Sequence, residues 1–265
     1  MLGLYDSGLG GLTVLRALRA AGVTQDIIYF ADQAHVPYGD RTDDDLHGLL
    51  AANLAFLETH AIDAVVMACN TSCAVASRMG WPKTCFAILD LIENAAKNPA
   101  NVAFSNIAVF GTAATVRSGA YGRAIRATSA STSVLEIAAP KLVPLVEAGK
   151  ADSAEAAEAV REVCRALPPS VDAIVYGCTH YPMLDAAFRA VLGEKIAIID
   201  PAQTQAAATR ALVSERALPA GSNVTHYVTN GDLPLFERNV RAWTHDAQAR
   251  VSHANLLQHG DFAKI

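Results

Sequence analysis

Two stretches of the chain share one pattern, DAVVMACNTSCA at residues 63–74 and DAIVYGCTHYPM at residues 172–183. Each begins with Asp-Ala, continues through β-branched residues and carries a cysteine at its seventh position. Short apolar runs rich in Val and Ile are typical of buried strands in a parallel sheet. The two cysteines, Cys69 and Cys178, are therefore expected directly after two similar strands.

The similarity extends to further pairs of segments in the same order. Cys69 and Cys178 are 109 positions apart, and AILD at 87–90 recurs as AIID at 197–200, an offset of 110. LGLYDS at 2–7 is echoed more weakly by IAVFGT at 107–112, an offset of 105. One such pair could arise in any two αβ segments, but three ordered pairs with nearly constant spacing indicate an internal duplication.

Alternation of Val-rich and Ala/Leu-rich stretches favours βαβ units and therefore the α/β fold class. We expect two similar αβ domains with mainly parallel sheets, related by pseudo-twofold symmetry. The first would comprise residues 1–93 plus 206–265, because the last segment falls outside the second repeat, and the second residues 94–205. Ligands of such sheets bind at the carboxyl ends of the strands, so the active site is expected in the cleft between the domains.

The expected elements follow from apolar runs and capping residues. Strands are predicted at 2–5, 27–31, 64–68, 87–89, 107–110, 134–138, 173–176, 196–199 and 225–228. Helices are predicted after Gly11, Thr42, Thr71, Asp90, Thr115, Lys141, Ser153, Pro182, Pro201 and Leu233.

Composition limits the function classes. The 265 residues are 52% hydrophobic, with a net charge of −5 and no run of Lys or Arg, which argues against a nucleic-acid partner. No apolar run reaches membrane-spanning length, and the N-terminus lacks a signal peptide pattern, so we expect a cytoplasmic protein without a membrane partner. The five scattered cysteines lack C-x-x-C or zinc spacing, which predicts free thiols and no metal site.

Two thiols at equivalent turns suggest a specific chemistry. A thiol at a helix N-terminus is expected to have a lowered pKa, which favours the thiolate. A lone cysteine is more often a small buried hydrophobe, and Cys73, Cys85 and Cys164 are assigned to packing. A thiolate on one face of a carbon and a thiol on the other can invert a stereocentre without a cofactor.

Other polar residues could support the thiols. Asp6 and Ser7 end the first strand in YDSGLGG, where Asp6 could orient a thiol or an ammonium group, or merely cap the turn. A nucleotide-binding loop is the rival interpretation, but GLGG lacks the full G-x-G-x-x-G spacing. His180 could exchange a proton with Cys178. Further candidates for binding an anionic substrate are Pro37, Tyr38, Gly39, Asn70, Thr71, Thr112, Thr115 and Thr179.

The chain resembles glutamate racemases of the cofactor-independent aspartate/glutamate racemase superfamily. The resemblance is carried by YDSGLGGLTVLRAL, DQAHVPYGDRT, MACNTSCAVA, GTAATVRSGAY, PLVEAG, YGCTHYPML and HYVTNGD, which cover most of the chain in the family's order. Departures are modest: Cys73 stands where a small residue is commoner, and His35 precedes the PYG turn.

This resemblance implies interconversion of L-glutamate and D-glutamate without a cofactor, supplying D-glutamate for peptidoglycan, by a protein that is a homodimer. Cys69 would deprotonate the D-enantiomer with help from Asp6, and Cys178 the L-enantiomer with help from His180 and Glu147. Substrate contacts would fall on Asp6, Ser7, Tyr38, Gly39, Asn70, Thr71, Thr112, Thr179 and His180.

Two alternatives remain from the residues alone. One is a racemase of aspartate or another amino acid, because physics alone does not set the side-chain length. The other is a non-catalytic αβ protein that binds a solute or nucleotide, which would have no use for paired cysteines in a cleft.

Overall fold

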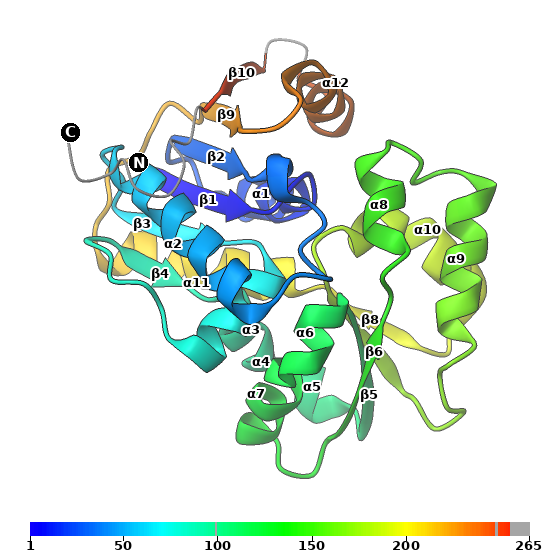
Figure 1. The fold of residues 1–265 in the computed structure, drawn as a ribbon. Coiled ribbons are helices and arrows are strands. Elements are labelled where there is room, and N and C mark those ends of the chain that lie inside the picture. The colour runs from blue at the N-terminus through cyan, green and yellow to red at the C-terminus, as the bar shows by residue number, and fades with distance from the viewer. Residues whose placement is uncertain (99, 247–248, 255–265) are drawn as a thin grey trace.

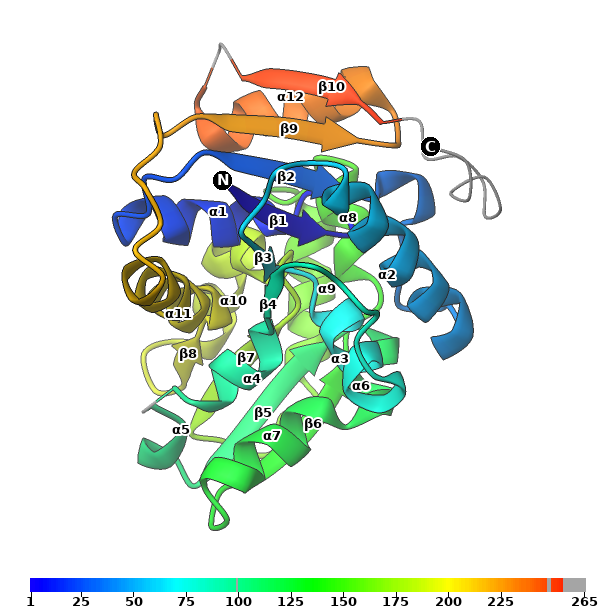
Figure 2. The ribbon, with the colours of Figure 1, turned by 90° about the vertical axis from the view of Figure 1, so that its left-hand side faces the viewer.

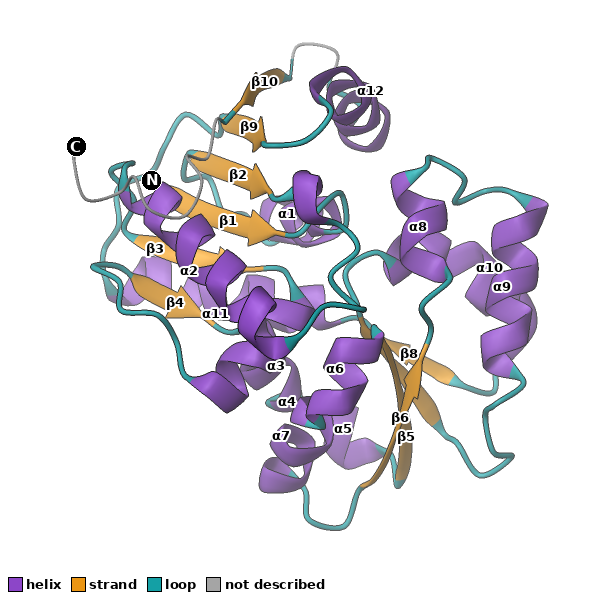
Figure 3. Ribbon diagram, viewed as in Figure 1, coloured by secondary structure: helices purple, strands orange, loops and turns teal. Residues whose placement is uncertain are grey.

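Two parallel sheets, each covered by helices on both faces, form the architecture of the computed structural model (Figures 1 and 3). Residues 1–98, 100–246 and 249–254 are described. The first sheet has the strand order β10-β9-β2-β1-β3-β4, and the second has the order β6-β5-β7-β8. Within the described residues, every strand pair is parallel, as the sequence predicts.

The strands are β1 (Leu2–Asp6), β2 (Ile27–Ala31), β3 (Ala64–Met67), β4 (Ala87–Leu89), β5 (Asn106–Gly111), β6 (Ser133–Ala138), β7 (Ala173–Gly177), β8 (Ala197–Ile199), β9 (Thr225–Thr229) and β10 (Arg250–His253). The helices are α1 (Gly11–Ala20), α2 (Asp43–Glu58), α3 (Asn70–Met79), α4 (Leu91–Ala96), α5 (Ala100–Ala103), α6 (Ala113–Ser118), α7 (Ala120–Thr128), α8 (Leu142–Glu147), α9 (Ala154–Cys164), α10 (Asp185–Leu192), α11 (Pro201–Glu215) and α12 (Leu233–Thr244). Two 3-10 turns are η1 (Gln33–His35) and η2 (Tyr181–Leu184).

The duplication is visible in the topology. The order β2-β1-β3-β4 in the first sheet repeats as β6-β5-β7-β8 in the second. Equivalent hydrogen bonds start the equivalent strand pairs: Asp63 N donates to Met1 O, and Asp172 N donates to Asn106 O, both at 2.9 Å. The segments that resemble each other in sequence therefore occupy equivalent places.

The AILD and AIID pair illustrates the same repetition at a helix start. Asp90 precedes α4 and accepts a hydrogen bond from Ile92 N at 2.7 Å. Asp200 precedes α11 and accepts one from Ala202 N at 2.9 Å. In each half the fourth strand thus ends in a carboxylate that caps the following helix, which satisfies a backbone donor that lacks a helical partner.

Two hydrophobic layers run across both sheets. One lies between the sheets and α1, α8, α9, α10, α11 and α12, and includes Leu4 and Phe110. The other lies under α2, α3, α4 and α7, and includes Tyr5 and Val109. Because successive strand residues alternate between faces, neighbouring residues of one strand contribute to different layers. The shared layers join the two halves closely.

The C-terminal region extends the first sheet. β9 pairs with β2, and β10 lies beyond it at the sheet edge (Figure 2). The sequence predicted the other nine strands to within about one residue, but it missed β10 and the short α5. The expected boundary between residues 205 and 206 falls inside α11, so that helix belongs to both parts of the proposed division. Among the described helices, none is long and apolar enough to cross a membrane.

The Asp90 cap makes stability depend on pH. Burial raises the pKa of Asp90 to about 6 from 3.8. Below about pH 4 the folded and unfolded states both hold the proton; between pH 4 and 6 the unfolded carboxyl ionises first, so the free energy of unfolding falls. Asp90→Asn keeps the cap without this loss and should be more stable than the wild type above pH 6, by about 1–3 kcal/mol.

Urea unfolding of both proteins at pH 3.5 and pH 8 measures the difference. Asp90→Ala, which loses the cap, is the control and should be less stable than Asp90→Asn at both pH values. An equal effect of Asp90→Asn at the two pH values would contradict the assignment.

Candidate active site

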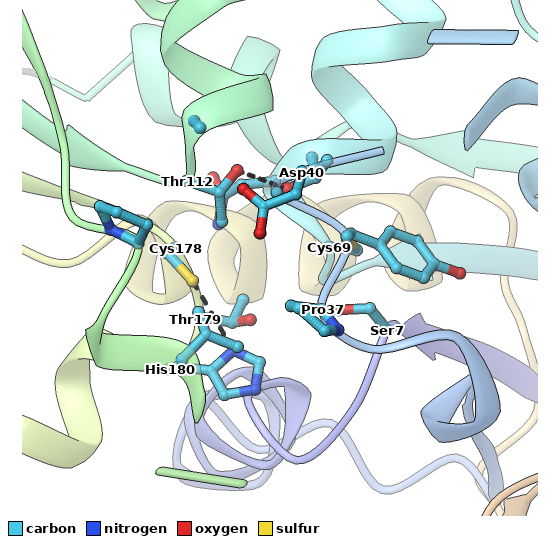
Figure 4. A pocket seen from close by; sticks show the side chains of 15 residues that line it. Ser7, Pro37, Asp40, Cys69, Thr112, Cys178, Thr179 and His180 are labelled. Atoms are coloured by element: carbon cyan, nitrogen blue, oxygen red, sulfur yellow. Dashed lines mark hydrogen bonds between the residues drawn. The ribbon is translucent and has the colours of Figure 1, made fainter. Parts of the chain in front are cut away.

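The two cysteines meet at one pocket between the halves of the chain. Cys69 follows β3 and precedes the first turn of α3, and Cys178 follows β7 just before η2. Both thus lie at the carboxyl ends of equivalent strands. They line the same pocket and approach it from opposite sides (Figure 4). The placement agrees with the expectation of an active site in the cleft.

Most of the residues predicted for the site line this pocket: Ser7, Pro37, Tyr38, Gly39, Cys69, Asn70, Thr71, Thr112, Cys178, Thr179 and His180. Asp6, Thr115 and Glu147 contact these residues from behind rather than forming the wall. The sequence analysis missed the lining residues Asp40, Ala113, Pro140 and Val143. Asp40 and Ala113 directly follow predicted site residues, whereas nothing in the motifs marks Pro140 or Val143.

The pocket is narrow. Its volume is about 30 Å³, far below the roughly 300–1,000 Å³ of typical ligand pockets. Binding of an organic substrate therefore requires the walls to move apart. Among the described residues, no group of three or more His, Cys, Asp or Glu could hold a metal ion.

On one side, His180 connects Cys178 to Glu147. The thiol sulfur lies 3.6 Å from Nδ1 of His180, and Nε2 of the same ring lies 2.6 Å from Oε1 of Glu147. Burial by itself lowers the pKa of His180, but the hydrogen bonds and charges of Cys178 and Glu147 outweigh burial and raise this pKa well above its usual value. The imidazolium form is therefore favoured beside Cys178.

Glu147 is held in place by three donors. Besides His180, its carboxylate accepts hydrogen bonds from Leu9 N at 2.7 Å and from Nε2 of Gln33 at 2.9 Å. Burial raises the pKa of Glu147, but His180 and these donors outweigh burial, so the pKa lies below its usual value. The fixed carboxylate orients the His180 ring from α8, the second half's own helix.

On the other side, Cys69 is a neutral thiol. Burial, followed by the charge of Asp6, raises its pKa to about 12, although hydrogen bonds with Ser72 and Ser7 act in the opposite direction. The prediction that the helix N-terminus lowers the pKa of this thiol was wrong, because removal from water outweighs the helix dipole.

Asp6 joins the two halves. Its Oδ2 accepts a hydrogen bond from Gly8 N at 3.0 Å, and its Oδ1 accepts one from the Thr179 hydroxyl at 3.1 Å. Burial raises the pKa of Asp6, whereas the charge of His180 lowers it. Asp6 thus caps its own turn, and its charge also acts on Cys69; a role in orienting a thiol or an ammonium group stays a prediction.

The glycines of DSGLGG allow close contact with the second half. A Cβ at Gly8 would lie 2.1 Å from Oε1 of Glu147, and one at Gly10 would lie 2.6 Å from Nδ1 and 2.8 Å from the backbone N of His180. Real Cβ atoms do not approach so closely, so only glycine fits at these positions. The rival interpretation of a nucleotide-binding loop therefore loses its support, since His180 and Glu147 occupy the space beside the turn.

Hydroxyl and amide groups form another wall. The hydroxyls of Thr71, Thr112 and Thr115 lie 2.9–3.3 Å from one another. Oδ1 of Asn70 accepts a hydrogen bond from the Tyr121 hydroxyl at 2.6 Å, while its buried Nδ2 has no hydrogen-bond partner among the described residues. An unpaired buried donor is costly, so Asn70 is a ready donor for an anionic group in the pocket.

The loop from Pro37 to Asp40 closes the site and is anchored behind it. The Tyr38 hydroxyl donates to Oδ2 of the fully buried Asp32, and Arg117 donates to the Gly39 carbonyl oxygen at 3.3 Å. The sequence analysis did not single out Asp32. Its position directly after β2, at the same sheet edge as Asp6, is the signal that could have identified it.

The chain is similar to known proteins along most of its length. The Asp/Glu/hydantoin racemase family model matches residues 13–209. A glutamate racemase of Desulforudis audaxviator is 40% identical over 211 residues, which cover 79% of this chain and 77% of that protein. One of Gloeobacter violaceus is 37% identical and covers 92% of both chains.

A solved structure has the same fold. The glutamate racemase isoform RacE1 of Bacillus anthracis superimposes with a TM-score of 0.90 at 27% identity, covering 97% of both chains. The matched family model spans most of the chain, including both cysteines. The chain therefore belongs to the Asp/Glu/hydantoin racemase family.

Proposed function

We propose that the protein interconverts L-glutamate and D-glutamate by proton transfer between two thiols, supplying D-glutamate for peptidoglycan. The observation that carries the proposal is the position of Cys69 and Cys178 at equivalent strand ends, on opposite sides of one pocket. An acid and a base on opposite faces of a carbon suit inversion of its configuration. The relatives named above, described as glutamate racemases, supply the choice of glutamate.

In the direction from D to L, the Cys69 thiolate removes the α-proton and the Cys178 thiol returns a proton to the other face. In the reverse direction the two thiols exchange roles. The high pKa of Cys69, about 12, is compatible with this role, because the ammonium group of a bound substrate would favour the thiolate. Asp6 is a suitable partner for that ammonium group.

Recognition of the substrate is assigned to the two walls of the pocket. Nδ2 of Asn70 and the hydroxyls of Thr71 and Thr112, supported by Thr115, donate to one carboxylate. The loop carrying Pro37, Tyr38 and Gly39 would hold the second, where the longer side chain of glutamate is distinguished from that of aspartate. Ser7, Thr179 and His180 complete the contacts around the reacting carbon.

Assistance to Cys178 comes from His180 and Glu147. An imidazolium 3.6 Å from the sulfur stabilises the thiolate that accepts a proton from L-glutamate. The Glu147 carboxylate keeps that imidazolium protonated and oriented. Glu147 therefore acts through His180 and is a positioning residue.

Incubation of the protein with L-glutamate in D₂O tests the proposal. We expect loss of optical rotation with incorporation of deuterium at the α-carbon, without an added cofactor. Loss of rotation with aspartate but not with glutamate would overturn the choice of substrate. Inertness toward all amino acids would favour a binding protein.

Substitution of either thiol should remove activity. We expect Cys69→Ser and Cys178→Ser each to lower kcat for racemisation by at least about 100-fold, because a hydroxyl is a poor base at neutral pH. Cys85→Ser alters an exposed cysteine outside the pocket and serves as the matched control. Full activity in either of the first two variants would exclude the two-thiol mechanism.

Glu147→Gln should lower the pKa of His180 and slow both directions equally. The equilibrium constant of a racemisation is one, so kcat/KM for the two enantiomers must fall by the same factor, about tenfold for each unit of pKa lost. Titration of the His180 ring by NMR and rates from both enantiomers measure the two effects. An unchanged His180 pKa would contradict the role given to Glu147.

A homodimer, expected from the family resemblance, and a cytoplasmic location, expected from the sequence pattern, remain predictions. Sedimentation velocity on the purified protein tests the first, with a single species of twice the mass of the chain as the expected result.

A further inference from the structure

A chain of hydrogen bonds connects Cys69 to the part-exposed side chain of His35. In order from the thiol, its members are Ser72, Tyr5, Tyr38, Asp32 and His35. The Tyr5 hydroxyl lies 3.3 Å from that of Ser72 and 2.9 Å from that of Tyr38. The Tyr38 hydroxyl donates to Oδ2 of Asp32.

Among the described residues, this chain of hydrogen bonds meets solvent at His35, and Asn230 also donates to Oδ1 of Asp32. Oδ1 of Asp32 lies 2.6 Å from Nδ1 of His35, whose side chain is 37% exposed, whereas the Asp32 side chain is fully buried. Tyr5 and Ser72 are also fully buried, and Cys69 itself is 3% exposed. The described structure thus gives this thiol a continuous polar route to solvent through the first half of the chain.

Asn53 contacts three neighbouring members of this chain of hydrogen bonds and holds them in position. Its Nδ2 lies 3.1 Å from the Tyr5 hydroxyl, 3.2 Å from that of Tyr38 and 3.0 Å from Oδ2 of Asp32. One amide thus fixes three successive members of the chain. A packing role alone does not account for a line of buried hydroxyls that ends at a carboxylate and an exposed imidazole.

The two-thiol reaction creates a need for such a route. After D-glutamate is converted to L-glutamate, Cys69 holds the proton it removed and Cys178 has lost one. The next turnover in the same direction requires Cys69 to lose its proton and Cys178 to regain one from solvent through the pocket, and the chain of hydrogen bonds serves the first of these two steps. We infer that the chain from Ser72 to His35 is a proton relay that restores the Cys69 thiolate between turnovers; this inference rests on the proposed function.

The direction of the hydrogen bonds suits a relay. The one hydroxyl hydrogen of Tyr38 is donated to Asp32, so in the hydrogen bond between the two tyrosines Tyr5 is the donor. The Tyr5 hydroxyl hydrogen is then in use, so Tyr5 accepts a hydrogen bond from Ser72. Ser72 is then free to accept from the Cys69 thiol. If one proton moves along each hydrogen bond toward Asp32, Cys69 becomes a thiolate and Asp32 becomes a carboxylic acid. Each hydroxyl between them gives one proton and receives one, so it ends with the same charge.

The last step delivers the proton to water. At rest, Nδ1–H of His35 donates to the Asp32 carboxylate. Once Asp32 holds the relayed proton, the part-exposed ring turns its unprotonated Nε2 to the carboxyl group, takes that proton and releases the one on Nδ1 to solvent, so one proton leaves Cys69 and one appears outside. Burial raises the pKa of Tyr5 and of Tyr38 well above its usual value. Both tyrosines therefore stay neutral and carry the proton through their hydroxyls rather than as stored charge.

Two substitutions interrupt the relay outside the pocket wall: Tyr5→Phe and His35→Asn. If the relay is broken, the free enzyme is slow to convert from the form with a Cys69 thiol to the form with a Cys69 thiolate. This conversion limits the rate only at high substrate concentration. At low substrate concentration the two forms have time to reach equilibrium before substrate binds. Each variant should therefore show kcat lowered by about 100-fold, with KM lowered in proportion and kcat/KM unchanged. A merely structural defect would instead lower kcat/KM.

Added imidazole distinguishes the relay further. It should restore kcat in His35→Asn by replacing the exposed proton acceptor, and it should not restore Tyr5→Phe, where the break is buried. The matched controls are His226→Asn, an exposed histidine on β9, and Tyr227→Phe, a buried tyrosine on the same strand, and both should behave as the wild type. Unchanged kcat in Tyr5→Phe and His35→Asn would overturn the relay.

A measurement without substrate separates this inference from the proposed function. After the protein is mixed with D₂O, the S–H group of Cys69 exchanges to S–D, and infrared spectroscopy follows this exchange. The S–H band of Cys69 is identified as the band that is absent from Cys69→Ser. We expect the exchange to be slower in Tyr5→Phe and His35→Asn than in the wild type. Equal exchange rates would overturn the relay. A wild type that exchanges normally but does not racemise glutamate would instead overturn the proposed function.

Discussion

The exclusion of water from ionisable groups is the constraint on which this site depends. Cys69 and His180 in the pocket wall, and Asp6 and Glu147 directly behind it, are almost closed off from solvent. A charge there is tolerated only beside a partner, so each protonation state is set by the neighbours. Glu147 and His180 stabilise each other as an ion pair. Cys69 has the negatively charged Asp6 nearby, so it is a neutral thiol unless a positively charged group, such as the ammonium group of a substrate, lies beside it.

The two thiols are therefore equivalent in topology but not in environment. Cys178 has its imidazole two residues away in its own turn, at 3.6 Å. Cys69 has hydroxyl neighbours and, behind them, the tyrosines and Asp32 of the first half. The duplicated fold thus provides two matching positions for a thiol. The neighbours of each thiol differ, so Cys178 exchanges protons beside His180 and Cys69 through the hydroxyls behind it.

Close contact between the halves is what brings these groups together. Gly8 and Gly10 let the first turn of one half lie against Glu147 and His180 of the other, where any side chain would collide. Thr13 reinforces the contact with a hydrogen bond to the Thr179 carbonyl oxygen at 3.1 Å. The hydrophobic layers that cross both sheets hold this arrangement, so stability and geometry of the site have a common origin.

The sequence by itself determined the parallel sheets, the duplication and most of the residues around the pocket. These follow from local patterns: strand composition, capping residues such as Asp90 and Asp200, and motifs at strand ends, where topology brings polar residues together. Only the tertiary structure decided the pKa of Cys69, the place of Asp32 and the contribution of Pro140 and Val143 to the wall. Burial and contacts between segments distant in the chain set these features, and no local pattern encodes how completely a side chain is removed from water.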